Sequence, residues 1–492
     1  MTKWLEKYTQ NFSMSLIYKS TILTALMGVV FLIVTSFYCP PNAEDFALSN
    51  APRYQGKLSS IINLLCFFDS RYTANLLHAL NPLVWGWYKS FFIIPIFCFA
   101  FFLLSVRFLL GSLFYSDKGK GLLWVQATFF TIAYFGVAPS LPYALFYMSS
   151  TFTYTYPCVF WMIWTSCLLR GFKSEGILHF LLNTTGLLFL ILSFGSSELF
   201  ILINGISLLL FLVLSLKKNR RRFYTALPYF IIGVVCLVLI YCLPSQKFTS
   251  ASMYGKLEDR YPEGNFILTS IQQYGKCWIK SIINPFLLLL LLVFALLSTY
   301  SKFKEPFIYK RKKSEIIGLL ILFQAGTILV TWPYMLARGS VYEEPNYIFN
   351  VAIFINLIIL LVIAPNLLNH IIDIKNKAYF KSSTFFGISA LLPISLFLTT
   401  PNYKEIISDL NNGKLQNFRK QQDDFYKNVD SVKNLTAHPW IVYFPQPKLP
   451  PKSVWLDGDL LPNRQNEDWN SAYEVYFGID ELRLPGDTIF KN

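Results

Sequence analysis

The sequence predicts an all-α polytopic membrane protein of about eleven transmembrane helices, followed by a small external α+β module. Three observations predict this class: 54% of the 492 residues are hydrophobic, only 14% are charged, and the mean hydropathy is +0.43. A water-soluble globular protein does not have this composition. Apolar segments long enough to cross about 30 Å of hydrocarbon recur along most of the chain.

Eleven apolar segments give the predicted spans and divide the chain. They lie near residues 18–39, 90–110, 121–138, 155–171, 177–195, 199–216, 226–244, 280–298, 315–336, 347–368 and 383–400. Proline and polar residues interrupt the stretch SLPYALFYMSSTFTYTYP, a pattern compatible with a partly re-entrant segment. We therefore expect a multispan domain over residues 1–400 and an external module over residues 401–492.

The basic residues predict the orientation of the spans. With the N-terminus inside, 22 of the 32 Lys and Arg residues before position 401 fall on the cytoplasmic side and 10 on the external side. This excess follows the positive-inside rule, so eleven spans leave the C-terminus outside. The first span lacks a clean small-residue cleavage site, which predicts an uncleaved signal anchor. The net charge of +15 is explained by charges that face anionic lipid, and we expect no nucleic-acid partner.

The cysteines and histidines indicate no metal or disulfide site. Most of the eight cysteines lie within predicted spans and none forms a CxxC pair, which is typical of small apolar packing residues. The four histidines are scattered, so no zinc site is predicted. The chain also has no Walker loop, GxGxxG, nucleophile elbow or HExxH motif, and soluble nucleotide-dependent chemistry has no visible site.

The first external loop, residues 40–89, is the favoured location of chemistry. Glu44 and Asp45 follow the first span directly, and acidic side chains beside a membrane are costly unless they are solvated or used. In the middle of the loop, KLSSIINLLCFF repeats apolar residues every three or four positions. This spacing predicts a helix that lies in the membrane interface and holds the flanking charges near the lipid headgroups.

A carboxylate in this loop can accept the proton of a hydroxyl group that attacks a sugar. We favour Asp45 for this role, aided by Glu44, because a shorter side chain is more easily fixed by packing. A solvated acidic loop is the alternative. Candidates for substrate binding are Asp69, Arg71, Tyr154, Tyr156, Glu198 and Arg338.

Each of these substrate-binding candidates also has a structural alternative. The arginines suit a phosphate because a planar guanidinium binds two oxygens at once. Asp69 and Arg71 can instead form a local ion pair, and Arg338 can anchor a lipid headgroup. The tyrosines can supply hydroxyls and ring faces to a sugar or belong to the aromatic belt. Glu198 has no evident cation nearby in the sequence and is either solvated at the interface or faces a polar cavity.

The last 92 residues differ in composition from the predicted spans. A polar helical stretch is expected over about 402–431, followed by a strand from Trp440 to Phe444 and a WNSAYEVYFG segment. We expect this module to pack on the membrane domain and to be too small to carry the chemistry alone.

Several short motifs resemble those of bacterial GT-C-type integral-membrane glycosyltransferases, particularly O-antigen-modifying glucosyltransferases. They are EDF after the first span, DSRYTANLL in the same loop, STFTYTYP, SSE at Glu198 and PYMLARGSVY. The resemblance spans most of residues 1–400, and the WNSAYEVYFG ending is similar to the external tails of such proteins.

This resemblance implies a multi-pass enzyme of the bacterial inner membrane. Its donor would be a sugar on polyprenyl phosphate and its acceptor a surface polysaccharide or lipid-linked glycan, with inversion at the outer leaflet. The resemblance also marks Glu44 and Asp45 as the catalytic position, and Arg71 and Arg338 as candidates for binding the donor phosphate. Many relatives carry DD or DE where this chain has ED, so which carboxylate is catalytic stays open. A divalent cation, Mg or Mn, is a possible cofactor, although clear metal ligands are missing.

Two other functions fit the same layout. An O-antigen-type polysaccharide polymerase would also use large external loops and arginines, but it would change chain length. A lipid-linked sugar transporter or flippase typically carries charged residues in mid-span and inverted repeats. Here nearly every charge sits near the end of a span and no repeat is visible, so we rank transport lower.

Overall fold

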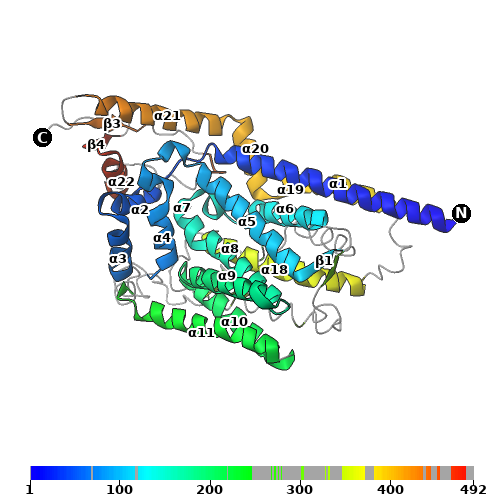
Figure 1. Cartoon of the computed structure of the whole chain (residues 1–492). Coiled ribbons are helices and arrows are strands. Elements are labelled where there is room, and N and C mark those ends of the chain that lie inside the picture. The colour runs from blue at the N-terminus through cyan, green and yellow to red at the C-terminus, as the bar shows by residue number, and fades with distance from the viewer. Residues whose placement is uncertain are drawn as a thin grey trace.

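The fold is a bundle of long helices with a cap of shorter helices at one end. The computed structural model describes residues 2–67, 70–116, 120–218, 220–245, 301–303, 346–371, 382–435, 439–444, 451–454 and 467–483, and isolated positions between 268 and 332. Figure 1 shows the N-terminus at one end of the bundle and the cap at the other.

The long helices follow the apolar segments of the sequence. They are α1 (Thr2–Ser36), α5 (Ile93–Leu113), α6 (Lys120–Val137), α8 (Tyr156–Gly171), α9 (Gly176–Phe194), α10 (Glu198–Lys218), α11 (Arg220–Cys242), α18 (Asn346–Ile371) and α19 (Ser382–Thr399). Near the N-terminal end of the bundle, β1 (Phe114–Ser116) pairs antiparallel with β2 (Ser301–Phe303).

Nine of the eleven predicted spans coincide with these helices, so the predicted helical class is confirmed and is consistent with a membrane protein. Within the described residues, five segments are both long and apolar enough to cross a membrane: Tyr18–Ser36, Tyr88–Leu113, Gly176–Phe194, Glu198–Leu216 and Arg220–Cys242. The predicted spans 280–298 and 315–336 lie outside the described residues, apart from a few isolated positions. The total of eleven spans therefore stays a prediction.

The long loop predicted between the first two spans folds into the cap. It contains α2 (Ala43–Tyr54), α3 (Lys57–Phe67) and α4 (Tyr72–Leu80), then the single turns η1 (Pro82–Trp85) and η2 (Tyr88–Ser90). The interrupted stretch before α8 forms η3 (Pro142–Phe146), α7 (Met148–Ser150) and η4 (Thr151–Thr155), where η3 and η4 are π-helical turns. The proline and polar residues of this stretch thus break the helix at the base of the cap.

The predicted interfacial helix is α3. It runs across the direction of the long helices (Figure 1), and its apolar side chains Leu58, Ile62 and Phe67 are 71%, 50% and 68% exposed. Exposed apolar side chains on a helix that lies across the bundle suit contact with lipid at the headgroup level.

The C-terminal module is built from α20 (Pro401–Asn411), α21 (Lys414–Lys433) and α22 (Glu467–Phe477), with β3 (Ile441–Tyr443) parallel to β4 (Glu481–Arg483). The strand predicted at Trp440–Phe444 is confirmed as β3. The polar helical stretch predicted over about 402–431 forms two helices, because the chain turns at Gly413 with a φ of 67°, a conformation that favours glycine. The WNSAYEVYFG segment lies largely in α22 and ends at Gly478.

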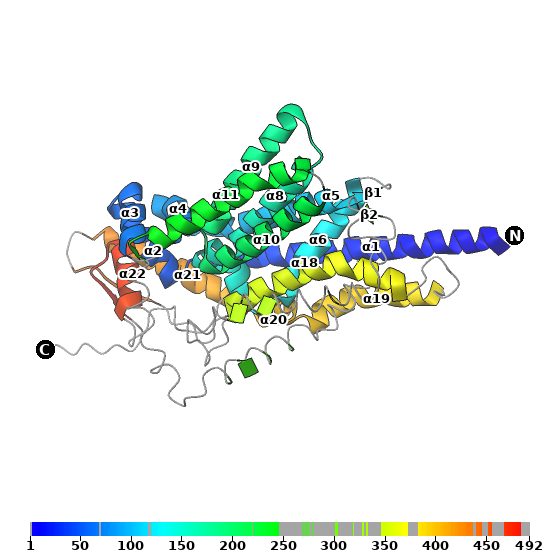
Figure 2. The ribbon, with the colours of Figure 1, turned by 90° about the horizontal axis from the view of Figure 1, so that it is seen from below.

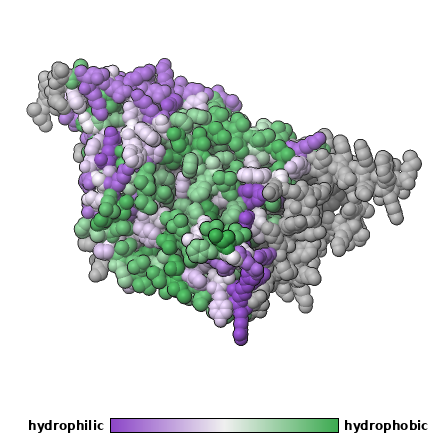
Figure 3. Space-filling view, viewed as in Figure 1, coloured by the Kyte–Doolittle hydropathy of each residue, from purple (hydrophilic) through white to green (hydrophobic). Residues whose placement is uncertain are grey.

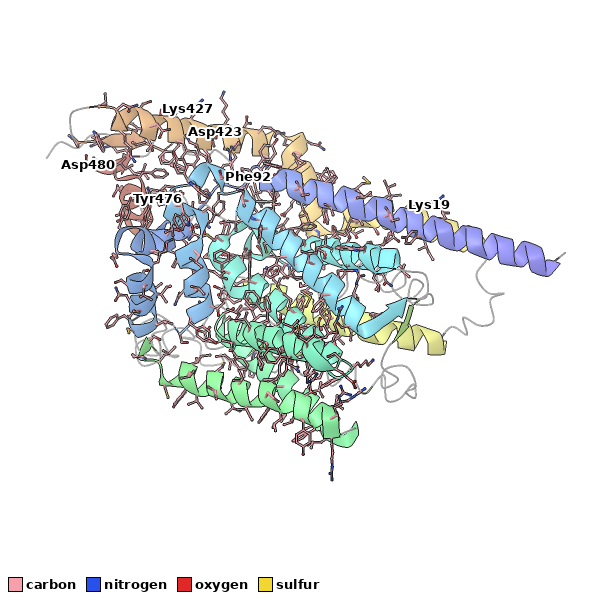
Figure 4. The ribbon with its side chains drawn as sticks, viewed as in Figure 1. Lys19, Phe92, Asp423, Lys427, Tyr476 and Asp480 are labelled. Atoms are coloured by element: carbon pink, nitrogen blue, oxygen red, sulfur yellow. The ribbon has the colours of Figure 1, made fainter. Side chains whose placement is uncertain are left out.

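This module packs on both the bundle and the cap. Tyr403 lies so close to α6 that a Cβ on Gly136 would be 2.8 Å from its ring, and Asn402 donates to the carbonyls of Phe135 and Ala138, both at 2.7 Å. The buried residues of α21 recur at three- and four-residue spacing, while Asp423 and Lys427 project from its outer face (Figure 4).

The surface separates into hydrophobic and hydrophilic regions. Figure 3 shows a broad hydrophobic face over the long helices, with hydrophilic residues gathered over α21 and at one end of α11. The view from below shows α9, α10 and α11 beside one another along the bundle (Figure 2). An apolar surface of this extent fits a lipid bilayer.

Candidate functional site

Asp45 is fully buried at the start of α2 and joins this helix to α7. Its backbone N–H donates to Asn42 Oδ1 at 2.9 Å, and Asp45 Oδ2 accepts from the Asn42 N–H at 3.1 Å, which is a capping box. Asp45 Oδ1 accepts from the backbone N–H of Ser149 in α7 at 3.2 Å. Both carboxylate oxygens are therefore engaged, and they fix α2 against the broken helix at the base of the cap.

The environment of Asp45 favours its protonated form. Burial raises the pKa of Asp45 to about 8, opposed by the backbone N–H of Asn42 and reinforced by the negative charge of Glu44. The N–H groups of Ser149 and Met148 also oppose the rise. Desolvation thus outweighs three favourable hydrogen bonds.

The raised pKa of Asp45 gives stability a pH dependence of definite sign. A carboxyl group with a higher pKa in the folded chain holds its proton more tightly there, so the free energy of unfolding falls as the pH rises towards that value. His78 acts in the opposite direction below its ordinary pKa of 6.5, since burial lowers its pKa to about 3. Of Asp45 and His78, only Asp45 contributes to the pH dependence between pH 6.5 and 8. We expect the free energy of unfolding to fall by about 2 kcal/mol over this interval.

Thermal unfolding of the detergent-solubilised protein at pH 6.5 and pH 8 measures this loss. The Asp45→Asn variant cannot titrate at this position, so its melting temperature should change less over the same interval. An equal change in the variant and the wild type would contradict the assignment.

Glu44 and Asp45 form an acid pair, and Glu44 is its accessible member. It is half-buried, whereas Asp45 beside it is fully buried. Both stand in the first turn of α2, where the helix dipole stabilises negative charge. The shorter side chain of Asp45 is fixed by packing, as predicted, but both of its oxygens accept hydrogen bonds from backbone N–H groups.

Buried polar atoms lie on the segments that pack around α2. Among the described residues, those without a hydrogen-bond partner include Asn42 Nδ2, His78 Nδ1, Ser149 Oγ, Thr151 Oγ1 and Tyr473 OH. His78 lies against Phe152, with ring centroids 5.3 Å apart, and its depressed pKa keeps the imidazole neutral. A sugar carries hydroxyl groups that can donate to or accept from such atoms.

The C-terminal helix α22 holds α2 in place. Phe46, next to Asp45, is fully buried among Tyr473, Tyr476 and Phe477, at ring distances of 4.8, 4.5 and 5.3 Å. The Tyr476 hydroxyl donates to the Leu83 carbonyl at 2.9 Å, and Figure 4 shows Tyr476 against the cap. The module at the end of the chain therefore positions the helix that carries the acid pair.

Arg71 and Glu198, two separate candidates in the sequence, form one ion pair. Arg71 Nε lies 3.1 Å from each Glu198 oxygen, and Arg71 Nη2 lies 3.1 Å from Oε2. The side chains are 17% and 33% exposed. Glu198, for which the sequence showed no nearby cation, is therefore paired with an arginine 127 residues away in the sequence. Close by, the Thr73 N–H donates to the Gly195 carbonyl at 2.8 Å, so the pair helps to tie α4 to the α9–α10 turn.

We expect loss of either partner to destabilise the cap. Arg71→Gln leaves a partly buried carboxylate without its charge partner, and Glu198→Gln does the same to the guanidinium. Each change should lower the free energy of unfolding by about 1–2 kcal/mol, and the double variant by less than the sum. A double-mutant cycle measured by thermal unfolding tests this; additive effects would contradict a direct pair.

Tyr154 and Tyr156 lie in the core. Tyr154 stacks on Tyr347 of α18 at 4.7 Å, and Tyr156 packs edge-on against Phe152 at 5.3 Å. They are 5% and 8% exposed. Their rings therefore pack against other aromatic side chains in the core.

Asp69 and Arg338 lie outside the described residues. Within the described part of the chain, no three His, Cys, Asp or Glu side chains are grouped to hold a metal ion. At the acid pair itself the Asp45 oxygens accept from backbone N–H groups, so the donor set fits a divalent cation poorly.

No protein-family model, curated protein or solved structure matches this chain. The geometry of the acid pair and its surroundings therefore carries the functional argument. Three residues of this site escaped the sequence analysis: Asn42, whose Asn-x-x-Asp capping pattern was a readable signal; His78; and Tyr473, which reaches the site from the other end of the chain.

Proposed function

We propose that this protein is a membrane glycosyltransferase that moves a sugar from a polyprenyl-phosphate donor to a surface polysaccharide or lipid-linked glycan. The observation that carries the proposal is the acid pair, Glu44 beside a fully buried Asp45, fixed at one end of a membrane-type helix bundle, with unpaired buried polar atoms on neighbouring described segments. Chemistry on a lipid-linked substrate needs reactive groups at this level, where a headgroup meets the aqueous phase.

Within the pair we assign different roles to the two carboxyl groups. Glu44, which is half-buried, is the general base, because a base must reach the hydroxyl whose proton it removes. Asp45 is a positioning residue that holds the first turn of α2 against Ser149. This division reverses the preference that the sequence alone suggested.

The proposed reaction is a single displacement. The acceptor hydroxyl oxygen forms a bond to the anomeric carbon of the sugar as the bond from that carbon to the phosphate oxygen breaks. The hydroxyl proton passes to Glu44, and polyprenyl phosphate leaves with the bonding electron pair. Attack from the face opposite the phosphate inverts the anomeric centre. Arg338 remains the candidate for binding the departing phosphate, because Arg71 is engaged by Glu198.

Deletion of the gene separates this function from its alternatives. Mass spectrometry of the surface glycans should show the loss of one sugar unit in the deletion strain and its return with the wild-type gene. A change in polysaccharide chain length without loss of a unit would identify a polymerase. Unchanged surface glycans would overturn the proposal, and accumulation of lipid-linked sugar in the inner leaflet would point to a transporter.

A further inference from the structure

Two arginines converge at the end of the bundle opposite the acid pair. Arg107 comes from α5 and Arg170 from the last turn of α8. A Cβ on Gly111 would lie 2.8 Å from Arg107 Nη1 and 3.0 Å from Arg170 Nη2. The two guanidinium groups thus share the space that a glycine leaves open, and any side chain at position 111 would enter it.

The positive charge at this point is not neutralised by a carboxylate among the described residues. Arg170 donates to Ser112 Oγ at 2.8 Å and to the Phe108 carbonyl at 3.1 Å. Arg107 lies 5.6 Å from the Trp124 ring, and its buried Nε has no hydrogen-bond partner. Two adjacent guanidinium groups repel each other, and a bridging anion removes that repulsion and satisfies the unpaired donor.

An apolar groove begins beside this arginine pair. It has a volume of about 370 Å³ and lies between α5, α8 and α9, lined by residues that include Leu104, Phe108, Cys167, Leu178 and Leu181. Phe108 belongs to both features, because the Arg170 guanidinium lies 4.0 Å above its ring. Leu104, Leu178 and Leu181 are more than half exposed, so the groove is open towards the surrounding hydrocarbon.

We propose that the groove and the arginine pair together bind one anionic phospholipid. Its acyl chain would lie in the groove between α5 and α9, and its phosphate would bridge Arg107 and Arg170. The basic residues of the sequence place this end of the bundle at the cytoplasmic leaflet, whose anionic lipids attract such charges. The site is at the far end of the bundle from Glu44 and does not depend on the proposed enzymatic function.

Arg107→Gln gives the cleaner test, since Arg107 makes no hydrogen bond among the described residues whereas Arg170 ties α8 to α5. The purified protein is titrated with phosphatidylglycerol and with phosphatidylcholine, and bound lipid is counted by native mass spectrometry. We expect the wild type to prefer phosphatidylglycerol and Arg107→Gln to weaken that lipid about fivefold or more. Arg220→Gln, an exposed basic residue outside the groove, should keep the wild-type preference.

Two further experiments show whether the ligand of this site is a lipid or a free phosphate. Leu181→Trp fills the groove from an exposed position and should weaken phosphatidylglycerol binding without loss of the fold. Glycerol phosphate and inorganic phosphate, which have no acyl chain, should compete poorly with the lipid. Equal binding of the two lipids, or an equal effect of Arg107→Gln and Arg220→Gln, would overturn the site. Strong binding of glycerol phosphate that survives Leu181→Trp would overturn the lipid as its ligand.

Discussion

The Glu44→Gln protein should lose sugar transfer by about 10²–10⁴-fold while it keeps its fold. Glutamine has nearly the shape of glutamate and can fill the same half-buried position, but it cannot accept the proton of the acceptor hydroxyl. The rate is measured with membranes that contain the protein and the labelled lipid-linked sugar pool. The melting temperature of the purified variant shows whether the loss arises from chemistry or from unfolding.

Two matched variants control this result. Glu175→Gln makes the same chemical change at the other end of the bundle, where Glu175 is 77% exposed and pairs with Arg221, and should transfer at the wild-type rate. Asp45→Asn replaces one oxygen acceptor by an amide N–H that faces a backbone donor, so it should lower stability and reduce transfer indirectly. The opposite result would be full transfer by Glu44→Gln and loss of transfer in an Asp45→Asn protein of unchanged stability. It would make Asp45 the general base and Glu44 the positioning residue.

Phe46→Ala should destabilise the joint between α2 and α22 by about 3–5 kcal/mol. The fully buried ring fills a cage of three aromatic side chains from α22, and its removal leaves a cavity that rigid neighbours cannot close. Because the same helix carries Glu44 and Asp45, sugar transfer should fall together with stability.

Chemical denaturation followed by tryptophan fluorescence measures this effect. Phe67→Ala is the matched control, since Phe67 lies on the neighbouring helix α3 and is 68% exposed, and its free energy of unfolding should change by less than about 1 kcal/mol. A Phe46→Ala protein as stable as this control would show that α22 does not hold α2.

The helical membrane class could be predicted because apolar length and composition determine it locally. The spans from α1 to α11 and the strand β3 follow from short stretches of sequence whose signals do not depend on distant residues. The break between η3 and α8 was equally visible, because proline and consecutive polar residues interrupt an apolar run.

The site itself depended on contacts between distant segments. Asp45 is buried by a stretch 104 residues away, so sequence alone could rank the two carboxylates only by side-chain length. Glu198 finds Arg71 across 127 residues, which a search for local partners cannot detect. The role of the C-terminal module, to hold α2 through Tyr473 and Tyr476, comes from residues more than 400 positions away along the chain.

The most direct test of the account is complementation of the deletion strain with Glu44→Gln, read by mass spectrometry of the surface glycans. The variant must first be shown in the membrane at the wild-type level and with the wild-type melting temperature. We predict glycans that lack the same single sugar unit as those of the uncomplemented strain. Full restoration of that unit by Glu44→Gln would contradict the claim that this carboxylate is the base of a sugar transfer.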